Sequence, residues 1–401
     1  MLLTYYLTSI KLPAASALFQ EAEMPVSQNQ KSVEKVGVWE SGVTGLHGPN
    51  PGQSPISESE LADWKRLSVY LRSQGMTFEA DQLVRKFAGG LANRNYLVVV
   101  DGVEAVLRRP PGGDLPPGSH DMAREHRILS NLSKVLAFIP RSLHFCDRRD
   151  VIGVPFQLIE YRPGIVVRGA DLSPVDGYDE APRMLCEMLV ATLARVHQVD
   201  AQSAGLGDLG RPEGFVARAI AGWSKRGALV SGSGSVQKLL DDISEWLNRV
   251  KFQERRPTLL HCDFKLDNIV LNPTDLSPVA LIDWDMGTRG DPLFDLATLL
   301  SYWVEPGDPV EWRNLGLMPT ANPGFWTRSE LAARYSAATG IDLDDLLPMR
   351  VLALFKLGIV FLQLHSHWVS GRIKDKRYAD FAALGENLLL IARDVSTGEL
   401  D

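Results

Sequence analysis

Hydrophobic and polar positions are distributed along the chain in three different ways. Up to residue 56 they follow no period, and residues 24–56 are rich in Gly, Ser, Pro, Gln and Lys. Because such a segment has too little apolar surface to build a core, we expect residues 1–56 to form a disordered leader, with Met24 as an alternative start. From residue 57 onward the apolar positions become periodic, and ordered structure is expected to begin there.

Between residues 57 and 163 most of the periodic segments predict β-strands. Residues 96–100 and 103–107 are rich in β-branched and aromatic residues and flank Asp101-Gly102, which is the strongest short signal for a β-hairpin. Further strands are expected in VIGVPFQLIEYRPG, and helices in SESELADWKRLSVYLRSQG and HDMAREHRILSNL. This region therefore predicts a small lobe built mainly of antiparallel sheet.

Residues 164–401 show mostly helical periodicity. The segments that carry it are APRMLCEMLVATLARVHQV, GSVQKLLDDISEWLNRV, DPLFDLATLLSYWV, TRSELAARYSAATG and residues 349–368. The exception is a pair of β-rich runs, NIVLN and VALIDW, which are separated by PTDLSP and are expected to form a second hairpin. A sheet-rich lobe followed by a larger helical lobe predicts an α+β fold with two lobes.

Composition and charge argue against several classes of partner. The formal net charge of −7 and the pI of about 5.7 are not those of a general polyanion binder, so no nucleic-acid partner is expected. The most apolar long segment, residues 351–365, is too short to span a bilayer and contains Lys356, which favours a buried helix over a membrane span. The three cysteines are scattered and form no CxxC pair, and a cytoplasmic location is predicted.

The stretch HCDFKLDN is the strongest candidate for catalysis. Its His261, Asp263 and Asn268 have the spacing H-x-D-x-x-x-x-N, and Asp283 follows in LIDWD. If NIVLN and VALIDW pair, Asn268 and Asp283 come together, and an amide oxygen beside a carboxylate suits Mg²⁺. Asp263 would face an acceptor hydroxyl as the base of a phosphoryl transfer, a reaction that mainly requires positioning and charge neutralisation. A solvated acidic turn is the alternative.

HCDFKLDN and IDWD together resemble the catalytic and metal-binding loops of the aminoglycoside phosphotransferase and choline kinase group, which are relatives of the protein kinases. Within that group, VLRRPP, AREHRIL, GDPLFDLA and FWTRSELAARYSAATG resemble the kinase-like domain associated with acyl-CoA dehydrogenases. The resemblance runs from about residue 60 to the end of the chain.

The resemblance implies a two-lobed protein-kinase-like fold that binds ATP and Mg²⁺ between its lobes and transfers the γ-phosphoryl group to a hydroxyl of a small molecule. It suggests a hydroxyacyl-CoA as that acceptor and a functional link to an acyl-CoA dehydrogenase. An aminoglycoside or a choline-like molecule is the alternative acceptor. Outside the enzymes, the alternatives are a catalytically silent nucleotide-binding scaffold and an acyl-CoA-binding regulatory module.

The resemblance also assigns nucleotide-binding roles in the small lobe. Arg108, in VEAVLR, stands where protein kinases carry the lysine that holds the α- and β-phosphates. Glu125, in AREHRIL, is its expected partner, and a surface Arg–Glu pair is the alternative. The adjacent Gly89 and Gly90 are candidates for a phosphate-covering turn, although a plain hairpin turn would have the same glycines.

The remaining candidates lie in the linker between the lobes and in the catalytic stretch. In QLIEYRPG, the backbone groups of Glu160 and Tyr161 are expected to meet the adenine edge. Lys265 is expected to contact the transferring phosphate, with a solvent-exposed lysine as the alternative. His261 is expected to brace the catalytic loop, Asp291 to cap a helix and Asp295 to tie that helix to the loop. Core or snorkelling roles are expected for Lys356, His365 and His367, with a place in the acceptor pocket as the alternative.

Overall fold

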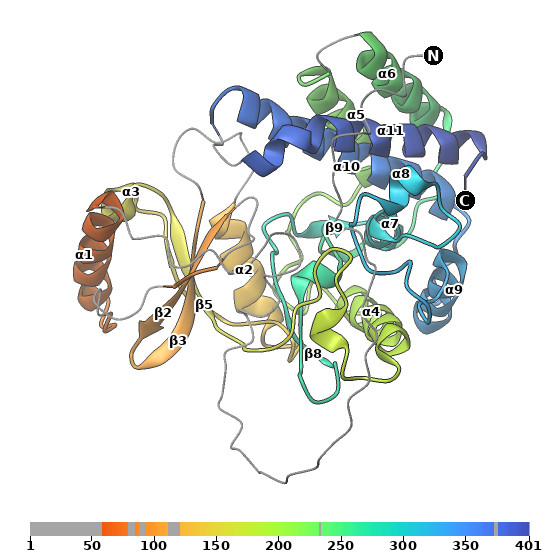
Figure 1. The fold of residues 1–401 in the computed structure, drawn as a ribbon. Coiled ribbons are helices and arrows are strands. Elements are labelled where there is room, and N and C mark those ends of the chain that lie inside the picture. Colours follow the sequence, from red (N-terminus) through yellow and green to blue (C-terminus); the bar gives the residue numbers. More distant parts are fainter. Residues whose placement is uncertain are drawn as a thin grey trace, which may run out of the picture. The chain divides into compact units, whose positions relative to one another are not determined.

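The computed structural model describes residues 58–78, 85–87, 93–110, 121–231, 234–372 and 376–400. Figure 1 shows how their helices and strands are arranged. The predicted leader, residues 1–56, and the pair Gly89-Gly90 lie outside the described residues.

The small lobe is built on a five-stranded antiparallel sheet with the strand order β1-β2-β3-β5-β4. Its strands are β1 (Arg85–Lys86), β2 (Arg94–Val100), β3 (Val103–Arg109), β4 (Ser142–Cys146) and β5 (Phe156–Glu160). β2 and β3 form the predicted hairpin, and φ is positive at both turn residues, 51° at Asp101 and 74° at Gly102. These are the angles of a type I′ turn, whose twist matches that of the flanking strands.

The two faces of this sheet pack against different cores, because side chains alternate along each strand. Ala105 and Leu107 of β3 share a core with Trp64 of α1 (Glu58–Ser73). Val106, between them, belongs to the core that contains Ile128 of α2 (Met122–Leu132) and most of the large lobe. Figure 1 shows α1 on the outer face of the sheet and α2 on the face toward the helical lobe. The helix α2 therefore links the sheet to the large lobe.

The small lobe departs from the prediction at its fourth strand. The apolar pattern does not predict β4 or the short helix α3 (Arg149–Ile152). Residues 151–152, which were expected in a strand, form the end of α3, and Gly153, with a φ of 80°, terminates it. A left-handed glycine is a common helix end, and here it delays the start of β5 to Phe156.

The large lobe consists mainly of helices. They are α4 (Ala181–His197), α5 (Phe215–Ala228), α6 (Gly234–Arg249), α7 (Leu293–Tyr302), α8 (Val310–Arg313), α9 (Arg328–Thr339), α10 (Leu346–Val369) and α11 (Phe381–Thr397), with the 3₁₀ turns η2 (Ser173–Val175), η3 (Leu266–Asn268) and η4 (Lys376–Asp380). Antiparallel pairs join β6 (Thr258–Leu260) to β9 (Thr288–Gly290) and β7 (Ile269–Leu271) to β8 (Pro278–Leu281). The predicted helical segments correspond to α4, α6, α7, α9 and α10, whereas α5 and α11 were not predicted.

The helix α10 is the apolar segment whose placement decides between a core helix and a membrane span. Its 24 residues are long and apolar enough to cross a membrane by length and composition. However, 67% of its most apolar window is buried inside the structure, and Lys356, near its middle, is only 5% exposed. This confirms the prediction of a buried core helix.

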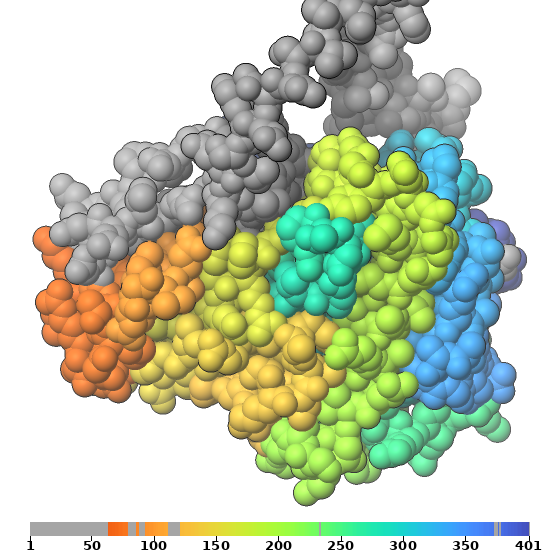
Figure 2. Space-filling model, turned by 90° about the horizontal axis from the view of Figure 1, so that it is seen from below, coloured from red at the N-terminus to blue at the C-terminus, as the bar shows by residue number. Residues whose placement is uncertain are grey.

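The linker between the lobes runs directly beside β7. The backbone N–H of Ile165 donates to Leu271 O over 2.8 Å, and the N–H of Leu271 donates to Ile165 O over 2.7 Å. A Cβ at Gly164 would lie 2.6 Å from Val270 Cγ1, so only glycine fits this crossing. In Figure 2 the turn between β7 and β8, coloured teal, lies at the surface next to the yellow-green segment that follows the linker. The second hairpin is thus fixed against the linker.

Candidate active site

The β7–β8 hairpin brings Asn268 and Asp283 together, as the sequence predicted. Ile269 pairs with Leu281, and the N–H of Ile282 donates to Asn268 O over 2.9 Å, so Asp283 follows directly on a residue bonded to Asn268. Asp283 has a φ of 70°, a left-handed conformation that is unusual for a residue other than glycine. Such backbone geometry is found most often at functional sites, where the surrounding structure maintains it.

A buried carboxylate, Asp295 of α7, holds the catalytic loop in shape. Its Oδ2 accepts the N–H of His261 over 2.6 Å, and its Oδ1 accepts the N–H of Cys262 over 2.7 Å. His197 Nε2 of α4 lies 3.3 Å from Oδ2. Burial alone would raise the pKa of Asp295, but these hydrogen bonds and the neighbouring histidines hold it below its usual value. The structure therefore gives Asp295 the tie between α7 and the catalytic loop that the sequence suggested.

His261 braces the loop from within, as expected. Its Nε2 donates to Ile282 O over 2.9 Å, and its Nδ1 accepts the N–H of Asp263 over 3.3 Å. These two contacts require the neutral ring with its proton on Nε2. Burial also lowers the pKa of His261, which keeps the ring neutral. The loop residue between them, Cys262, has a φ of 66°, so the turn that presents Asp263 is left-handed as well.

Three donors surround the carboxylate of Asp263. Lys265 Nζ lies 3.0 Å from its Oδ2, Asn268 Nδ2 donates to the same oxygen over 3.0 Å, and Tyr302 donates to its Oδ1 over 2.9 Å. Burial would raise the pKa of Asp263, but the charges of Lys265 and Lys356 lower it below its usual value. Asp263 is therefore ionised at neutral pH, which is the state that can accept a proton from a hydroxyl.

Lys265 and Tyr302 both contact the carboxylate of Asp263, and these contacts together with burial determine their charge states. Lys265 is paired with Asp263 rather than free in solvent, so the alternative of a fully exposed lysine is wrong. Burial opposes its charge, but the neighbouring Asp263 raises the pKa of Lys265 well above its usual value. Burial raises the pKa of the Tyr302 phenol, which keeps it a hydrogen-bond donor. Tyr302 was not predicted, because a tyrosine in an apolar helix gives no signal of its own.

Arg108 lies at the centre of an acidic cluster. Its Nε lies 2.8 Å from Glu125 Oε2, its guanidinium is paired with Asp283, and Asp285 Oδ2 is 3.9 Å away. Arg108 is 6% exposed and Glu125 is 1% exposed, so the alternative of a surface ion pair is wrong. The N–H of Trp284 donates to Glu125 Oε1 over 3.2 Å, which ties α2 to the loop that carries Asp283.

The carboxylates around Arg108 offer oxygen ligands of the type that a hard divalent cation takes. Glu125, Asp283 and Asp285 provide three carboxylates against the single charge of Arg108. Burial and the nearby Asp283 raise the pKa of Asp285 well above its usual value, so this crowded carboxylate favours binding a proton or a cation. Among the described residues, no group of three or more His, Cys, Asp or Glu side chains is placed so that it could hold a metal ion by itself. A site with few protein ligands is the kind expected for Mg²⁺, because substrate phosphates and water supply the rest of its coordination.

The linker residues Glu160 and Tyr161 lie beside the sheet, and some of their polar groups already form hydrogen bonds or ion pairs. The N–H of Glu160 donates to Arg141 O over 2.8 Å, and its carboxylate lies 2.9 Å from Arg162 Nη2. The ring of Tyr161 stacks on that of Phe87, with centroids 6.3 Å apart. A contact between the Glu160 backbone and an adenine is thereby limited to its carbonyl oxygen.

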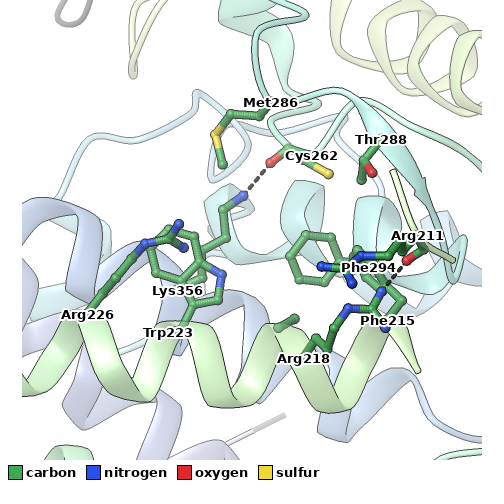
Figure 3. A pocket seen from close by; sticks show the side chains of 11 residues that line it. Arg211, Phe215, Arg218, Trp223, Arg226, Cys262, Met286, Thr288, Phe294 and Lys356 are labelled. Carbon is green, nitrogen blue, oxygen red and sulfur yellow. Dashed lines mark hydrogen bonds between the residues drawn. The ribbon is translucent and has the colours of Figure 1, made fainter. Parts of the chain in front are cut away.

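A cavity of about 300 Å³ lies in the large lobe beside the catalytic loop. Figure 3 shows α5 along one side of it, Lys356 of α10 reaching the carbonyl of Cys262, and Phe294 of α7 and Met286 close by. Cys262 immediately precedes Asp263, so the cavity lies next to the candidate base. It was not predicted, because α5 itself was not.

The fold and the site define a protein-kinase-like phosphotransferase: a sheet lobe with a buried Arg–Glu pair, and a helical lobe whose loops carry Asp263, Asn268 and Asp283. Residues 83–348 match the phosphotransferase enzyme family, and the chain belongs to that family. This confirms the predicted family and the prediction that the protein is an enzyme of this class.

Curated relatives carry the names of acyl-CoA dehydrogenase family members. The chain is 27% identical to mouse acyl-CoA dehydrogenase family member 10 over 88% of its length and 33% of the relative's. It is 30% identical to rat acyl-CoA dehydrogenase family member 11 over 77% of its length and 40% of the relative's. The chain thus spans only about a third to two-fifths of these relatives.

Solved structures with the same fold come from phosphotransferases. A Ralstonia eutropha protein assigned to the aminoglycoside phosphotransferases is 23% identical, with a TM-score of 0.67 over 83% of this chain and 98% of the other. The GDP and kanamycin complex of APH(2″)-IIIa is 17% identical, with a TM-score of 0.55 over 82% of this chain and 98% of the other. At these identities the likeness establishes the fold, and it confirms the predicted α+β, two-lobed protein-kinase-like architecture.

Proposed function

We propose that this protein is an ATP-dependent kinase that transfers the γ-phosphoryl group to a hydroxyl of a small molecule, with Mg²⁺ as its metal ion. The observation that carries the proposal is the half-buried, ionised Asp263, held by Tyr302, Lys265 and Asn268 beside the hairpin that brings Asn268 and Asp283 together. A solvated acidic turn would have neither the burial nor the donors.

Each residue has a specific role in this proposal. Asp263 orients the acceptor hydroxyl and accepts its proton as the new oxygen–phosphorus bond forms and the bond to the leaving ADP breaks. Asn268 Oδ1 and Asp283 would hold Mg²⁺, which when bound neutralises charge on the phosphates. Arg108, oriented by Glu125, steadies the α- and β-phosphates, and Lys265 contacts the transferring group.

A nucleotide fits the family and the fold. Related structures contain GDP with kanamycin, and AMP-PNP with hygromycin B in APH(4)-Ia, which is 16% identical to this chain with a TM-score of 0.51. These ligands belong to those proteins, and ATP is our inference for this one. The carbonyl of Glu160 and the backbone of Tyr161 are the proposed adenine contacts.

We propose a hydroxyacyl-CoA as the acceptor and a functional link to an acyl-CoA dehydrogenase. The names of the relatives support this acceptor, and so does the lining of the cavity beside Asp263, which contains no carboxylate among the residues that the structure describes. An aminoglycoside or choline-like acceptor carries positive charge and would meet a cavity wall that includes Lys356 and three arginines.

Steady-state turnover of the purified protein tests the proposal. ADP release is measured with ATP and Mg²⁺ in the presence of a hydroxyacyl-CoA, kanamycin or choline, and the phosphorylated product is identified by mass spectrometry. We expect product with the hydroxyacyl-CoA and a fall of at least about 100-fold in kcat for Asp263→Asn. Nucleotide binding without turnover of any acceptor would instead support the silent scaffold.

A further inference from the structure

The cavity beside the catalytic loop combines positive charge with an apolar wall. Its cationic side chains are Arg211, Arg218, Arg226 and Lys356, and its apolar ones include Phe215, Trp223, Met286 and Phe294. Figure 3 shows that Phe215, Arg218, Trp223 and Arg226 all come from α5, which forms one side of the cavity. Among the described residues, no Asp or Glu side chain lines it.

None of these four side chains forms an ion pair within the described part of the chain, although the charge of Lys356 acts on nearby Asp263. Arg218 donates to the backbone carbonyls of Glu213 and Arg211, and Arg226 lies over the Trp223 ring, 4.5 Å from its centroid. Neither these two residues nor Arg211 or Lys356 forms an ion pair with a described carboxylate, whereas Arg255 and Arg328 each pair with two or more. In a chain with a net charge of −7, this is a local positive field that attracts an anion.

Lys356 links the cavity to the catalytic loop. It is buried in an apolar helix, its ammonium donates to Cys262 O, and it lies 5.2 Å from the centroid of the Phe294 ring. A bound anion would add to the compensation that this buried ammonium receives from the carbonyl, the ring face and the charge of Asp263. Because Cys262 immediately precedes Asp263, an anion held by Lys356 lies next to the candidate base.

We propose that this cavity is the acceptor subsite and that it selects an acceptor bearing an acidic group, phosphate or carboxylate, next to an apolar segment. The inference rests on the proposed kinase function and deepens it, because it names the chemistry the acceptor must have. Arg218 and Arg226 are specificity-determining residues that attract the acidic group. Lys356 positions it against the loop that carries Asp263, and the aromatic side chains hold the apolar segment.

Three acceptors with the same hydroxyacyl chain test the charge requirement. They are the hydroxyacyl-CoA, which carries phosphates; the free hydroxy acid, which carries a carboxylate; and the N-acetylcysteamine thioester, which is uncharged. We expect kcat/KM to be at least about tenfold higher for one of the two acids than for the uncharged thioester. Which acid is preferred tells whether phosphate or carboxylate is recognised, and equal values for all three acceptors would overturn the proposal.

Substitutions on α5 test the residues. Arg218 and Arg226 are exposed, so Arg218→Gln and Arg226→Gln leave the core intact. Each is expected to lower the acid-to-neutral ratio of kcat/KM at least about fivefold, mainly through KM. Arg249→Gln on α6 removes an exposed arginine that pairs with Glu245 and should keep the wild-type ratio. If kcat/KM fell equally for the charged and the neutral acceptors, the role of Arg218 and Arg226 would be merely structural.

Direct binding separates this inference from the kinase proposal. Calorimetry follows the binding of a non-reactive acyl-CoA and of the matching fatty acid to the wild type and to the Arg218→Gln/Arg226→Gln double variant. Binding that is weakened at least about tenfold in the double variant supports the subsite even if no acceptor is turned over. Unchanged binding of both ligands overturns the subsite and leaves the kinase proposal to its own test.

Discussion

Replacement of Asp295 by asparagine tests how the fold shapes the catalytic loop. The side chain is fully buried and accepts the N–H groups of His261 and Cys262 over 2.6 and 2.7 Å. Asparagine has almost the same shape, but only its oxygen can accept a hydrogen bond. One of the two N–H groups would then face the amide nitrogen, which is also a donor, and the negative charge would be lost.

The expected loss of stability follows from these contacts. A hydrogen bond to a charged group contributes about 1.5–3 kcal/mol, and a buried donor left without an acceptor costs about 1–3 kcal/mol. Asp295→Asn loses one charged bond outright and weakens the other, so the free energy of unfolding should fall by about 3–5 kcal/mol at pH 7. Because the loop also positions Asp263, kcat should fall by at least about tenfold.

Urea unfolding followed by tryptophan fluorescence measures this loss. Asp150→Asn is the control: among the described residues the exposed Asp150 is ion-paired with Arg148 alone, and its replacement should leave the urea midpoint close to that of the wild type. The pKa of Asp295 is lowered in the folded state, so its stabilisation is present above the unfolded value of about 3.9 and is lost as pH falls through the folded pKa. The difference between wild type and Asp295→Asn should therefore shrink in acid. A loss below about 1 kcal/mol at pH 7 would refute the assigned role.

Three further predictions follow from the site. Tyr302→Phe removes the donor 2.9 Å from Asp263 Oδ1, so kcat should fall about tenfold with KM for ATP unchanged; an equal rise in KM would contradict a role at Asp263. Gly164→Ala places a methyl group against β7 and should lower the free energy of unfolding by about 1–3 kcal/mol. An unchanged urea midpoint would contradict the close contact between the linker and β7. Because the pKa of Asp263 is lowered, protonation of this carboxylate should not reduce kcat/KM above about pH 4. A fall in kcat/KM below about pH 6 that disappears in Asp263→Glu would contradict an ionised base.

Arg108 shows how an arginine fits where protein kinases carry lysine. Its guanidinium is held between Glu125 of α2 and Asp283 of the loop after β8, with Asp285 nearby. A planar group with five donors can contact two acids at once, which a single ammonium does less well. Since both acids lie on elements that flank the proposed nucleotide site, Arg108 ties the small lobe to the large one.

Local patterns made much of the fold and site predictable. The Asp101-Gly102 turn defined one hairpin, and the spacing of HCDFKLDN and LIDWD placed Asn268 and Asp283 at the end of another. These features depend on residues close together in sequence, where turn chemistry and alternation determine the structure.

The features that could not be predicted depend on tertiary contacts. Tyr302 reaches Asp263 only because α7 packs beneath the catalytic loop. Asp285 stands in LIDWD, yet its burial beside Arg108 appears only when the lobes meet. The charge of the cavity arises from α5 and α10, which are far apart in sequence and carry their cations at positions that look like ordinary surface or core residues.

Transfer of the labelled γ-phosphoryl group from ATP to a hydroxyacyl-CoA is the most direct test of the central claim. With the purified protein and Mg²⁺, the account predicts labelled acceptor from the wild type. It predicts none above background when EDTA removes the metal, and at least about 100-fold less from Asp263→Asn. Label transfer by Asp263→Asn at the wild-type rate, or transfer that is unaffected by EDTA, would contradict it.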